Sequence, residues 1–185
     1  LGTFSPYMVV HKSSVVKIDP SIPFEVACLV GCGVTTGYGS AIRSGNVRPG
    51  DDVAIVGIGG VGMGALQGAV IAGARNIFAI DPVEWKRDQA LKFGATHAYP
   101  DLDAAMMGIA EVTQGLMANK TILTVGELKG ADMDSYLNLT AKGGTCVLTA
   151  IGSMLDTDVT LNLSMLTLLQ KNLQGTIFGG GNPHH

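Results

Sequence analysis

The sequence has few charges, few aromatic residues and few cysteines, and these shortages exclude several classes of protein. Charged residues make up 15% of the 185 residues and aromatic residues 5%. Disordered chains are usually rich in charge, so this content argues against disorder. The 12 basic and 15 acidic residues leave a net charge of −3, which provides no basic surface for nucleic acid or an anionic membrane.

Only three cysteines are present, and they cannot all pair. No charged segment followed by an apolar one, as in a signal peptide, follows Leu1. We therefore expect reduced thiols, a cytoplasmic protein and an internal piece of a longer chain. The mean hydropathy of +0.33 is high for a free-standing domain, so we expect other protein to cover part of the surface. For each thiol taken alone, the simplest interpretation is a small buried hydrophobic residue.

One long uncharged stretch, from Val53 to Ala74, raises the question of a membrane span, because its glycines recur at every fourth position. Seven glycines interrupt it, however, and its apolar residues divide into a short run at 53–56 and a helix-like run further on. The charged flanks also suit a soluble strand, turn and helix. We predict that arrangement rather than a membrane helix.

Glycine is abundant, with 26 residues, about double the usual ~7%. No G-X-Y period supports collagen; instead, short β-branched runs alternate with helical stretches. This alternation predicts βαβ units and a doubly wound α/β domain with a six-stranded parallel sheet. We expect strands at 53–56, 76–80, 98–99, 121–125, 145–151 and 173–178, and helices at 60–73, 82–93, 104–114, 131–141 and 163–170, the fourth helix closed by Gly143-Gly144.

The first fifty residues have a different pattern. Residues 7–10 and 15–18 are strand-like, and a helix is expected from about Phe24. A second helical stretch is predicted for 35–43, followed by a turn at 48–51 that leads into the first buried strand. This segment resembles the end of another domain with a connecting helix.

The first predicted strand runs directly into a glycine-rich turn, Gly57-Ile58-Gly59-Gly60-Val61-Gly62. In a dinucleotide-binding βαβ unit, the first glycine permits a tight turn and the second lets the backbone approach a pyrophosphate. The third, here Gly62, lets helix and strand pack closely. The following helix N-terminus offers free N–H groups to phosphate. The alternative is a glycine-rich turn without a ligand.

Asp81 ends the second predicted strand, 19 residues after Gly62. A carboxylate at this place is suited to accept both hydroxyls of the adenosine ribose, and it repels a 2′-phosphate. Pro82-Val83 supplies no adjacent arginine for such a phosphate, so NAD is favoured over NADP. Lys86, one turn into the next helix, is within reach of the ribose. The alternative is an aspartate that only caps the helix.

Four further blocks carry a resemblance to a known family: GCGVTTGYGSAI at 31–42, VGIGGVG at 56–62, TVG at 124–126 and LQGTIFGG at 173–180. Together they resemble the zinc-dependent alcohol dehydrogenases of the medium-chain dehydrogenase/reductase superfamily. The resemblance runs through essentially the whole chain and is strongest to the liver-type, formaldehyde dehydrogenase and nicotinoprotein branch. It implies a Rossmann cofactor domain at 31–185, preceded at 1–30 by the end of a GroES-like catalytic β domain and a connector.

The resemblance also implies roles for individual residues. Cys32 falls on a ligand of the catalytic zinc, and Thr36 on the residue that contacts the nicotinamide ring. Gly60 and Val61 supply amides to the pyrophosphate, while Asp81 and Lys86 serve the adenosine ribose. Cys28, Cys146 and the four histidines match no ligand. Three positions are implied to line the cofactor cleft: Val125, Thr149 and Ile151, with Thr149 where relatives often carry Val.

The activity that the resemblance implies is NAD-dependent oxidation of an alcohol to an aldehyde or ketone, with Zn²⁺ holding the alcohol oxygen. Of the zinc ligands, this chain supplies only Cys32, so the isolated segment is expected to be inactive. Family members pair through the last strands of the cofactor domain, which predicts a homodimer or homotetramer. Against this, the apolar stretch at 159–178 is equally typical of a buried strand and helix.

Two other functions share the glycine turn. A non-catalytic NAD(H)-sensing module would keep the turn and Asp81 but would have no need of the block around Cys32. A methyltransferase usually has an acid before the turn, and here the strand is VAIVG. Both are less favoured than the dehydrogenase.

Overall fold

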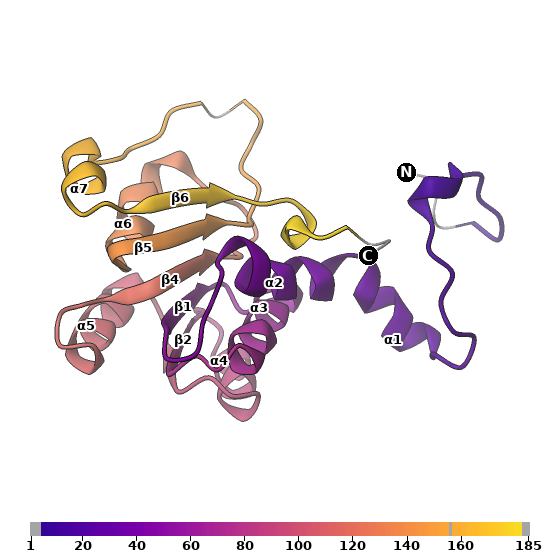
Figure 1. Ribbon diagram of the computed structural model, residues 1–185, viewed down its shortest axis with the longest axis horizontal. Coiled ribbons are helices and arrows are strands. Elements are labelled where there is room, and N and C mark those ends of the chain that lie inside the picture. The colour runs from indigo at the N-terminus through magenta and orange to yellow at the C-terminus, as the bar shows by residue number, and fades with distance from the viewer. Residues whose placement is uncertain (1–4, 156, 183–185) are drawn as a thin grey trace.

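A computed structural model describes residues 5–155 and 157–182. Six parallel strands form one sheet in the order β3-β2-β1-β4-β5-β6, with helices on both faces (Figure 1). This order is that of the Rossmann fold, and it confirms the doubly wound α/β prediction. The strands are β1 (Asp52–Val56), β2 (Asn76–Ile80), β3 (His97–Tyr99), β4 (Ala118–Leu123), β5 (Thr140–Leu148) and β6 (Asn172–Gly175).

The helices follow the strands in the order that a doubly wound sheet requires. At the N-terminal side, one continuous helical stretch runs from Phe24 to Ser44 and includes two π-helical segments, η2 and η3. The α-helices are α1 (Phe24–Leu29), α2 (Thr35–Gly39), α3 (Gly60–Ile71), α4 (Glu84–Lys92), α5 (Leu102–Val112), α6 (Met133–Asn138) and α7 (Leu163–Leu168); the others are η1 (Lys12–Ser14), η2 (Val30–Val34), η3 (Ser40–Ser44), η4 (Gly130–Asp132) and η5 (Phe178–Gly180).

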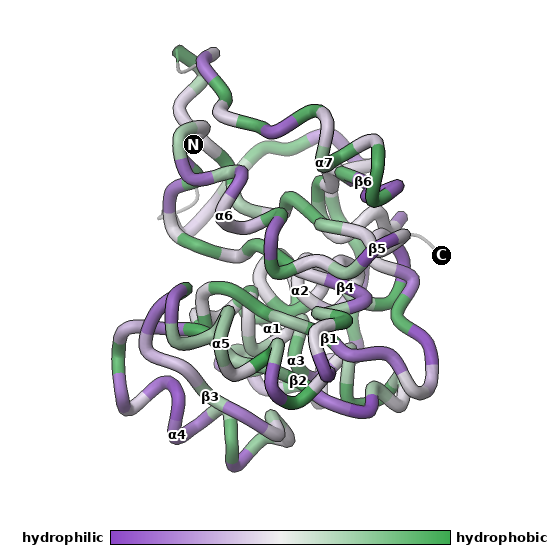
Figure 2. The backbone as a smooth tube through the Cα atoms, turned by 90° about the vertical axis from the view of Figure 1, so that its left-hand side faces the viewer, coloured by the Kyte–Doolittle hydropathy of each residue, from purple (hydrophilic) through white to green (hydrophobic). Residues whose placement is uncertain are grey.

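The core consists of two layers, one on each face of the sheet. Alternate residues of β1 point to opposite faces: Val53 and Ile55 pack with Leu66 of α3, and Ala54 packs with Ile109 of α5. All five β1 residues are buried, as expected for a central parallel strand. Hydrophobic segments accordingly gather around β1, β2 and α3 (Figure 2).

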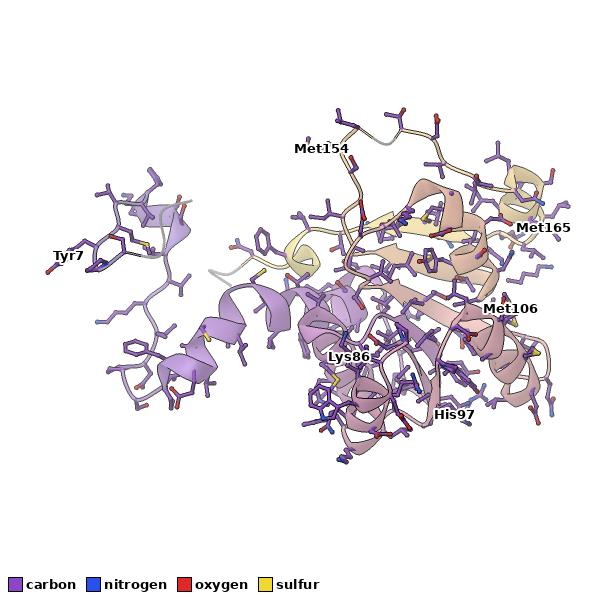
Figure 3. All side chains as sticks on the ribbon, turned by 180° about the vertical axis from the view of Figure 1, so that it is seen from behind. Tyr7, Lys86, His97, Met106, Met154 and Met165 are labelled. Atoms are coloured by element: carbon purple, nitrogen blue, oxygen red, sulfur yellow. The ribbon has the colours of Figure 1, made fainter. Side chains whose placement is uncertain are left out.

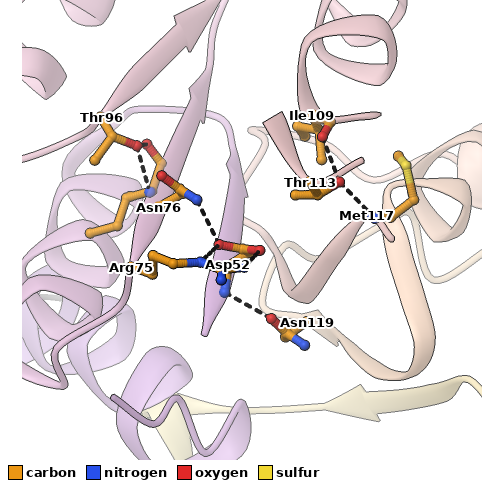
Figure 4. Close-up of polar contacts among 9 residues, drawn as sticks. Asp52, Arg75, Asn76, Thr96, Ile109, Thr113, Met117 and Asn119 are labelled. Atoms are coloured by element: carbon orange, nitrogen blue, oxygen red, sulfur yellow. Dashed lines mark hydrogen bonds and ion pairs between the residues drawn. The ribbon is translucent and has the colours of Figure 1, made fainter. Parts of the chain in front are cut away.

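At the amino end of the sheet, buried Asp52 is neutralised by an ion pair (Figure 4). Arg75 donates to both carboxylate oxygens, and Asn76 Nδ2 donates to Oδ1 at 2.8 Å. The Asp52 amide donates to Asn119 Oδ1 at 2.8 Å. These bonds join β1 to the starts of β2 and β4 at the edge opposite the glycine turn, so their role is structural.

Two expectations for the secondary structure are wrong. Residues 7–10 and 15–18 form no strand; they are separated by η1, and no strand of the described chain pairs with them. This segment lies away from the sheet, with Tyr7 far from Lys86 and His97 (Figure 3). A strand needs a hydrogen-bonded neighbour, and local β propensity cannot supply one.

The second correction concerns Gly143-Gly144, which does not close a helix. Helix α6 ends at Asn138, and both glycines lie inside β5. Here the pairing with β4 shifts register between Ala118 and Lys120, and Gly143 has φ +71°. The glycines therefore form an irregularity in the strand, where positive φ favours glycine.

The membrane interpretation of 53–74 is also resolved, because these residues form β1, the glycine turn and α3. None of the helices within 5–155 and 157–182 has the length and apolar character that crossing a bilayer needs.

The buried thiol of Cys146 predicts a loss of stability at alkaline pH. Cys146 is 0% exposed, and burial raises its pKa from 9.0 to about 12. Between these values the unfolded chain has lost the proton and the folded chain keeps it. Stability must therefore fall as pH rises from 9 to 12, by roughly 1.4 kcal/mol per pH unit.

Urea unfolding at pH 8 to 11 tests this expectation, with Cys146→Ala as the comparison. The variant should lose markedly less stability across this range than the unmodified chain. Tyr99 and Tyr136, whose pKa values burial also raises, contribute to both proteins alike. The same pH dependence in both would contradict the assignment.

Candidate nucleotide-binding site

The glycine turn connects the carboxyl end of β1 to α3, and two of its glycines are required by the chain itself. Gly57 has φ +93°, and a Cβ there would lie 2.8 Å from Thr124 O and Val125 N. At Gly62, a Cβ would collide with the Gly57 carbonyl oxygen. The first and third glycines thus perform the packing that the motif predicts.

The other two glycines have no internal reason to lack a side chain. A Cβ at Gly59 or Gly60 would meet no atom within 4 Å. Gly59 precedes the first turn of the 12-residue helix α3, and no side chain caps that end. The first N–H groups of a helix have no intrahelical partner, and the dipole there favours an anion. The turn is therefore open to a phosphate group that approaches the backbone.

Asp81 ends β2 and is 3% exposed. Oδ2 accepts from the Ile58 amide at 2.8 Å, and Oδ1 accepts from the Val83 amide at 2.9 Å. Lys86 Nζ lies 3.4 Å from Oδ2. The carboxylate thus braces the start of α4, the capping role weighed as the alternative, and also the glycine turn, which was not predicted.

These contacts limit how many ribose hydroxyls the Asp81 carboxylate can accept, which was predicted to be two. A carboxylate has about four lone-pair positions, and three donors already approach Asp81. Oδ1 can accept one further hydroxyl as it stands. A second requires Lys86 to leave Oδ2; the Lys86 side chain is 36% exposed, and its contact is long.

An arginine also lies beside the end of β2, although it is not adjacent to Asp81 in the sequence. Arg87 Nη1 donates to the carbonyl oxygens of Asp81 and Pro82, at 2.8 and 3.0 Å. The guanidinium group therefore holds the backbone of this turn.

A largely apolar cavity of about 280 Å³ lies between the glycine turn and the ends of β2 and β3. Its lining includes Val125, one of the three positions that the family resemblance implies for the cofactor cleft. Other lining residues come from separate segments, and no sequence signal marks them. The full lining is Val56, Gly57, Ile80, Pro82, Pro100, Asp101, Leu102, Val125 and Tyr136.

Thr36 lies on the other side of the turn, on α2, which packs directly on α3. A Cβ at Gly37 would collide with the Val61 carbonyl oxygen, so the two backbones touch. Thr149 follows β5 and reaches η3, which continues α2, because its hydroxyl donates to Ser40 Oγ at 2.9 Å. The structure thus brings Val61, Thr36 and Thr149 to one region.

Ile151, which lies two residues after Thr149, is 70% exposed. In contrast, η5 does contact α2, although no site residue was predicted in η5. Phe178 has φ +48°, unusual for a residue other than glycine. A Cβ at the following Gly179 would lie 2.7 Å from the carbonyl oxygens of Thr35 and Thr36. The Phe-Gly-Gly block at 178–180 is the sequence feature that could have indicated this close contact.

Cys32 lies in η2 between two glycines, and its side chain is exposed. Within the described residues, no group of three or more His, Cys, Asp or Glu is placed to hold a metal. Cys28 is exposed and Cys146 is buried. The described residues therefore offer two exposed thiols, those of Cys28 and Cys32, but not the donor set of a zinc centre, which needs three or four protein ligands.

Two histidines have contacts of their own. The His97 ring lies 5.2 Å from the Phe78 ring, centroid to centroid, and 6.5 Å from the Tyr99 ring. His11 Nδ1 lies 2.7 Å from Ser13 Oγ. The prediction that neither is a metal ligand has no finding against it; the prediction for His184 and His185 falls outside the described residues.

Comparison with known proteins decides the family. A family model described as zinc-binding dehydrogenase matches residues 60–185. The chain belongs to the zinc-binding dehydrogenase family. This confirms the family that the GCGVTTGYGSAI block and the glycine turn predicted.

The zinc-binding dehydrogenase chain is similar to several named alcohol dehydrogenases. It is 83% identical over 185 residues to alcohol dehydrogenase B of Mycobacterium tuberculosis, covering 100% of this chain and 49% of that protein. It is 45% identical over 185 residues to an NDMA-dependent alcohol dehydrogenase of Amycolatopsis methanolica, covering 50% of that protein. The chain spans about half the length of the curated relatives it matches.

Among solved structures, benzyl alcohol dehydrogenase from Acinetobacter calcoaceticus superposes with a TM-score of 0.81 at 28% identity. The match covers 91% of this chain and 46% of that one. The Rossmann arrangement of this chain is therefore that of a zinc-binding dehydrogenase.

Proposed function

We propose that this chain is the cofactor-binding part of an NAD- and zinc-dependent alcohol dehydrogenase that oxidises alcohols to aldehydes or ketones. One observation carries the proposal. The Asp81 carboxylate, at the end of β2, is bonded to the amide of Ile58 inside a turn whose open glycines have no packing role. A ribose-binding acid and a phosphate-binding turn are thus joined in one rigid unit, as dinucleotide binding requires.

Within this proposal, the residues divide the cofactor between them. Gly59, Gly60 and Val61 offer backbone amides to the pyrophosphate, and Asp81 with Lys86 holds the adenosine ribose. The apolar cavity beside Val125 accommodates the adenine. Thr36, Thr149 and Ile151 serve the nicotinamide half. When bound, NAD supplies the hydride acceptor; the protein supplies placement and electrostatics.

Cys32 is proposed as one thiolate ligand of the zinc. Because the described residues lack the rest of a donor set, the remaining ligands are assigned to polypeptide outside this chain. The division of the chain into two domains is likewise part of this proposal. Residues 1–30 are proposed to be the end of a catalytic domain and a connector. Between Tyr7 and Val34 many large apolar side chains are exposed, which supports a covering by further protein.

The proposed partners are a small alcohol or aldehyde substrate and a second copy of the protein. Strand β6 is one of the two edge strands of the sheet, and all four of its residues are exposed. An uncovered edge favours pairing with another chain, which supports a homodimer or homotetramer. Three unpaired thiols support a cytoplasmic location.

Titration with NAD and NADP tests the nucleotide assignment. NAD should bind at least about tenfold more tightly, because the buried carboxylate of Asp81 repels a 2′-phosphate. In Asp81→Ser the preference should shrink toward equality. Both affinities should also fall, since the brace on the Ile58 amide is lost.

Asp101→Ser is the matched control. Asp101 lines the same cavity, and its side chain accepts from the Ala104 amide as the N-cap of α5, a role that serine also fills. This substitution removes one negative charge without loosening the turn, so the ratio of the two affinities should stay within about twofold. Equal affinities for NAD and NADP in the unmodified protein would contradict the assignment.

A further inference from the structure

Tyr136 belongs both to the core and to the cavity beside the glycine turn. It lies on α6 and is 8% exposed. It packs in the same core layer as Ile109 of α5 and Leu123 of β4. The same residue also lines the cavity of about 280 Å³, together with Val125. The ring is therefore held by packing while part of the residue faces the cavity.

The hydroxyl group of Tyr136 has no hydrogen-bond partner among the described residues. In the described part of the chain, every side-chain nitrogen or oxygen that is sealed from solvent does have a partner, so this hydroxyl is not sealed. Because the residue is otherwise buried, the cavity that it lines is the space into which the hydroxyl opens. Polar groups in a protein interior are normally paired, so an open hydroxyl at this place indicates a ligand.

The rest of the cavity wall offers few polar side chains to a ligand. Among the lining residues, only Tyr136 and Asp101 have polar side chains. Asp101 is exposed, and its Oδ1 already accepts from the Ala104 amide at 2.8 Å. Burial raises the pKa of Tyr136, so the phenol keeps its proton at neutral pH and can donate it to a ligand. One neutral hydroxyl in apolar surroundings suits a flat, uncharged ring with a polar edge.

The position of the cavity indicates which ring this is. Its lining includes Gly57, the first residue of the glycine turn. It also includes Ile80 and Pro82, which flank Asp81 in the sequence. Under the NAD-binding function proposed above, Asp81 holds the adenosine ribose. The ring that lies beside this ribose is the adenine base.

We propose that the Tyr136 hydroxyl forms a hydrogen bond with the polar edge of the adenine base. The inference rests on the proposed NAD-binding function and adds to it a binding residue for the base. Adenine has ring nitrogens that accept and an amino group that donates, and a hydroxyl without another partner can pair with either. Recognition of the base in this cavity would then depend on a hydrogen bond as well as on apolar contact.

Binding of ADP-ribose, measured by calorimetry, tests the inference on the full-length polypeptide to which this chain is proposed to belong. ADP-ribose contains the adenine base and lacks the nicotinamide. Tyr136→Phe keeps the ring and removes the hydroxyl, so it should weaken the binding of ADP-ribose by about fivefold. The midpoint of urea unfolding without ligand should stay the same or rise, because the hydroxyl has no partner among the described residues to lose.

Tyr99→Phe is the matched control. Burial also raises the pKa of Tyr99, but this residue does not line the cavity, and its hydroxyl lies against Gly108 of α5, where a Cβ would collide with it. This substitution should leave the affinity for ADP-ribose within about twofold.

Two results would overturn the role of Tyr136. One is an unchanged affinity for ADP-ribose in Tyr136→Phe. The other is a weaker affinity together with a lower urea midpoint, which would make the hydroxyl a structural group. Failure of the unmodified protein to bind both NAD and ADP-ribose would instead overturn the proposed function itself.

Discussion

Gly59→Val is expected to lower the affinity for NAD by at least about a hundredfold and to leave the free energy of unfolding nearly unchanged. The branched side chain would occupy the space in front of the open amides, and hydrogen bonds to a charged group are worth about 1.5–3 kcal/mol each. Loss of two such bonds exceeds a hundredfold. The fold should tolerate valine, because a Cβ at Gly59 meets no atom within 4 Å and its backbone, at φ −89°, suits any residue.

Gly62→Ala is the informative contrast, although it adds only one methyl group. That methyl would collide with the Gly57 carbonyl oxygen, so unfolding should occur at clearly lower urea concentration. Gly60→Ala, in open space, should fold normally. NAD titration and urea unfolding of all three variants measure both quantities. Undiminished NAD binding by Gly59→Val would show that this turn does not hold the pyrophosphate.

Cys32→Ser is expected to abolish alcohol-dependent NADH formation in the full-length polypeptide and to remove about one equivalent of zinc. Loss of an outer partner of a metal ligand costs roughly 10–100-fold in affinity or activity, and loss of a thiolate ligand itself should cost more. Cys28→Ser is the matched control. Cys28 is also exposed and lies one helical turn earlier, where its thiol donates to the Glu25 carbonyl oxygen. It should keep full zinc content and activity.

The 185-residue chain alone should neither retain stoichiometric zinc nor turn over alcohol, because a single thiolate cannot replace three protein ligands. Metal analysis and NADH absorbance measure both properties. Stoichiometric zinc on the isolated chain would contradict the role of Cys32 as one ligand among several. A full-length polypeptide that binds NAD but has neither zinc nor turnover would instead favour an NAD-sensing function.

Several parts of the fold and site could be predicted from the sequence because their signals are local. Strand β1, the glycine turn and α3 are contiguous in the sequence. Asp81 is placed by the strand that it ends. The parallel, doubly wound class of the sheet follows from the alternation of strands and helices, which restricts the possible topologies.

The tertiary structure alone decided the rest, because it depends on contacts between segments far apart in the chain. Residues 7–10 have the β propensity of a strand but no neighbour within the described chain. Gly143 has the conformation of a helix terminator, yet pairing with β4 places it inside a strand. Only folding brings Arg87 against the carbonyl of Asp81, Tyr136 into the cavity, and Ser40 between Thr36 and Thr149. Sequence patterns report propensities over a few residues, whereas such contacts depend on which strands lie side by side.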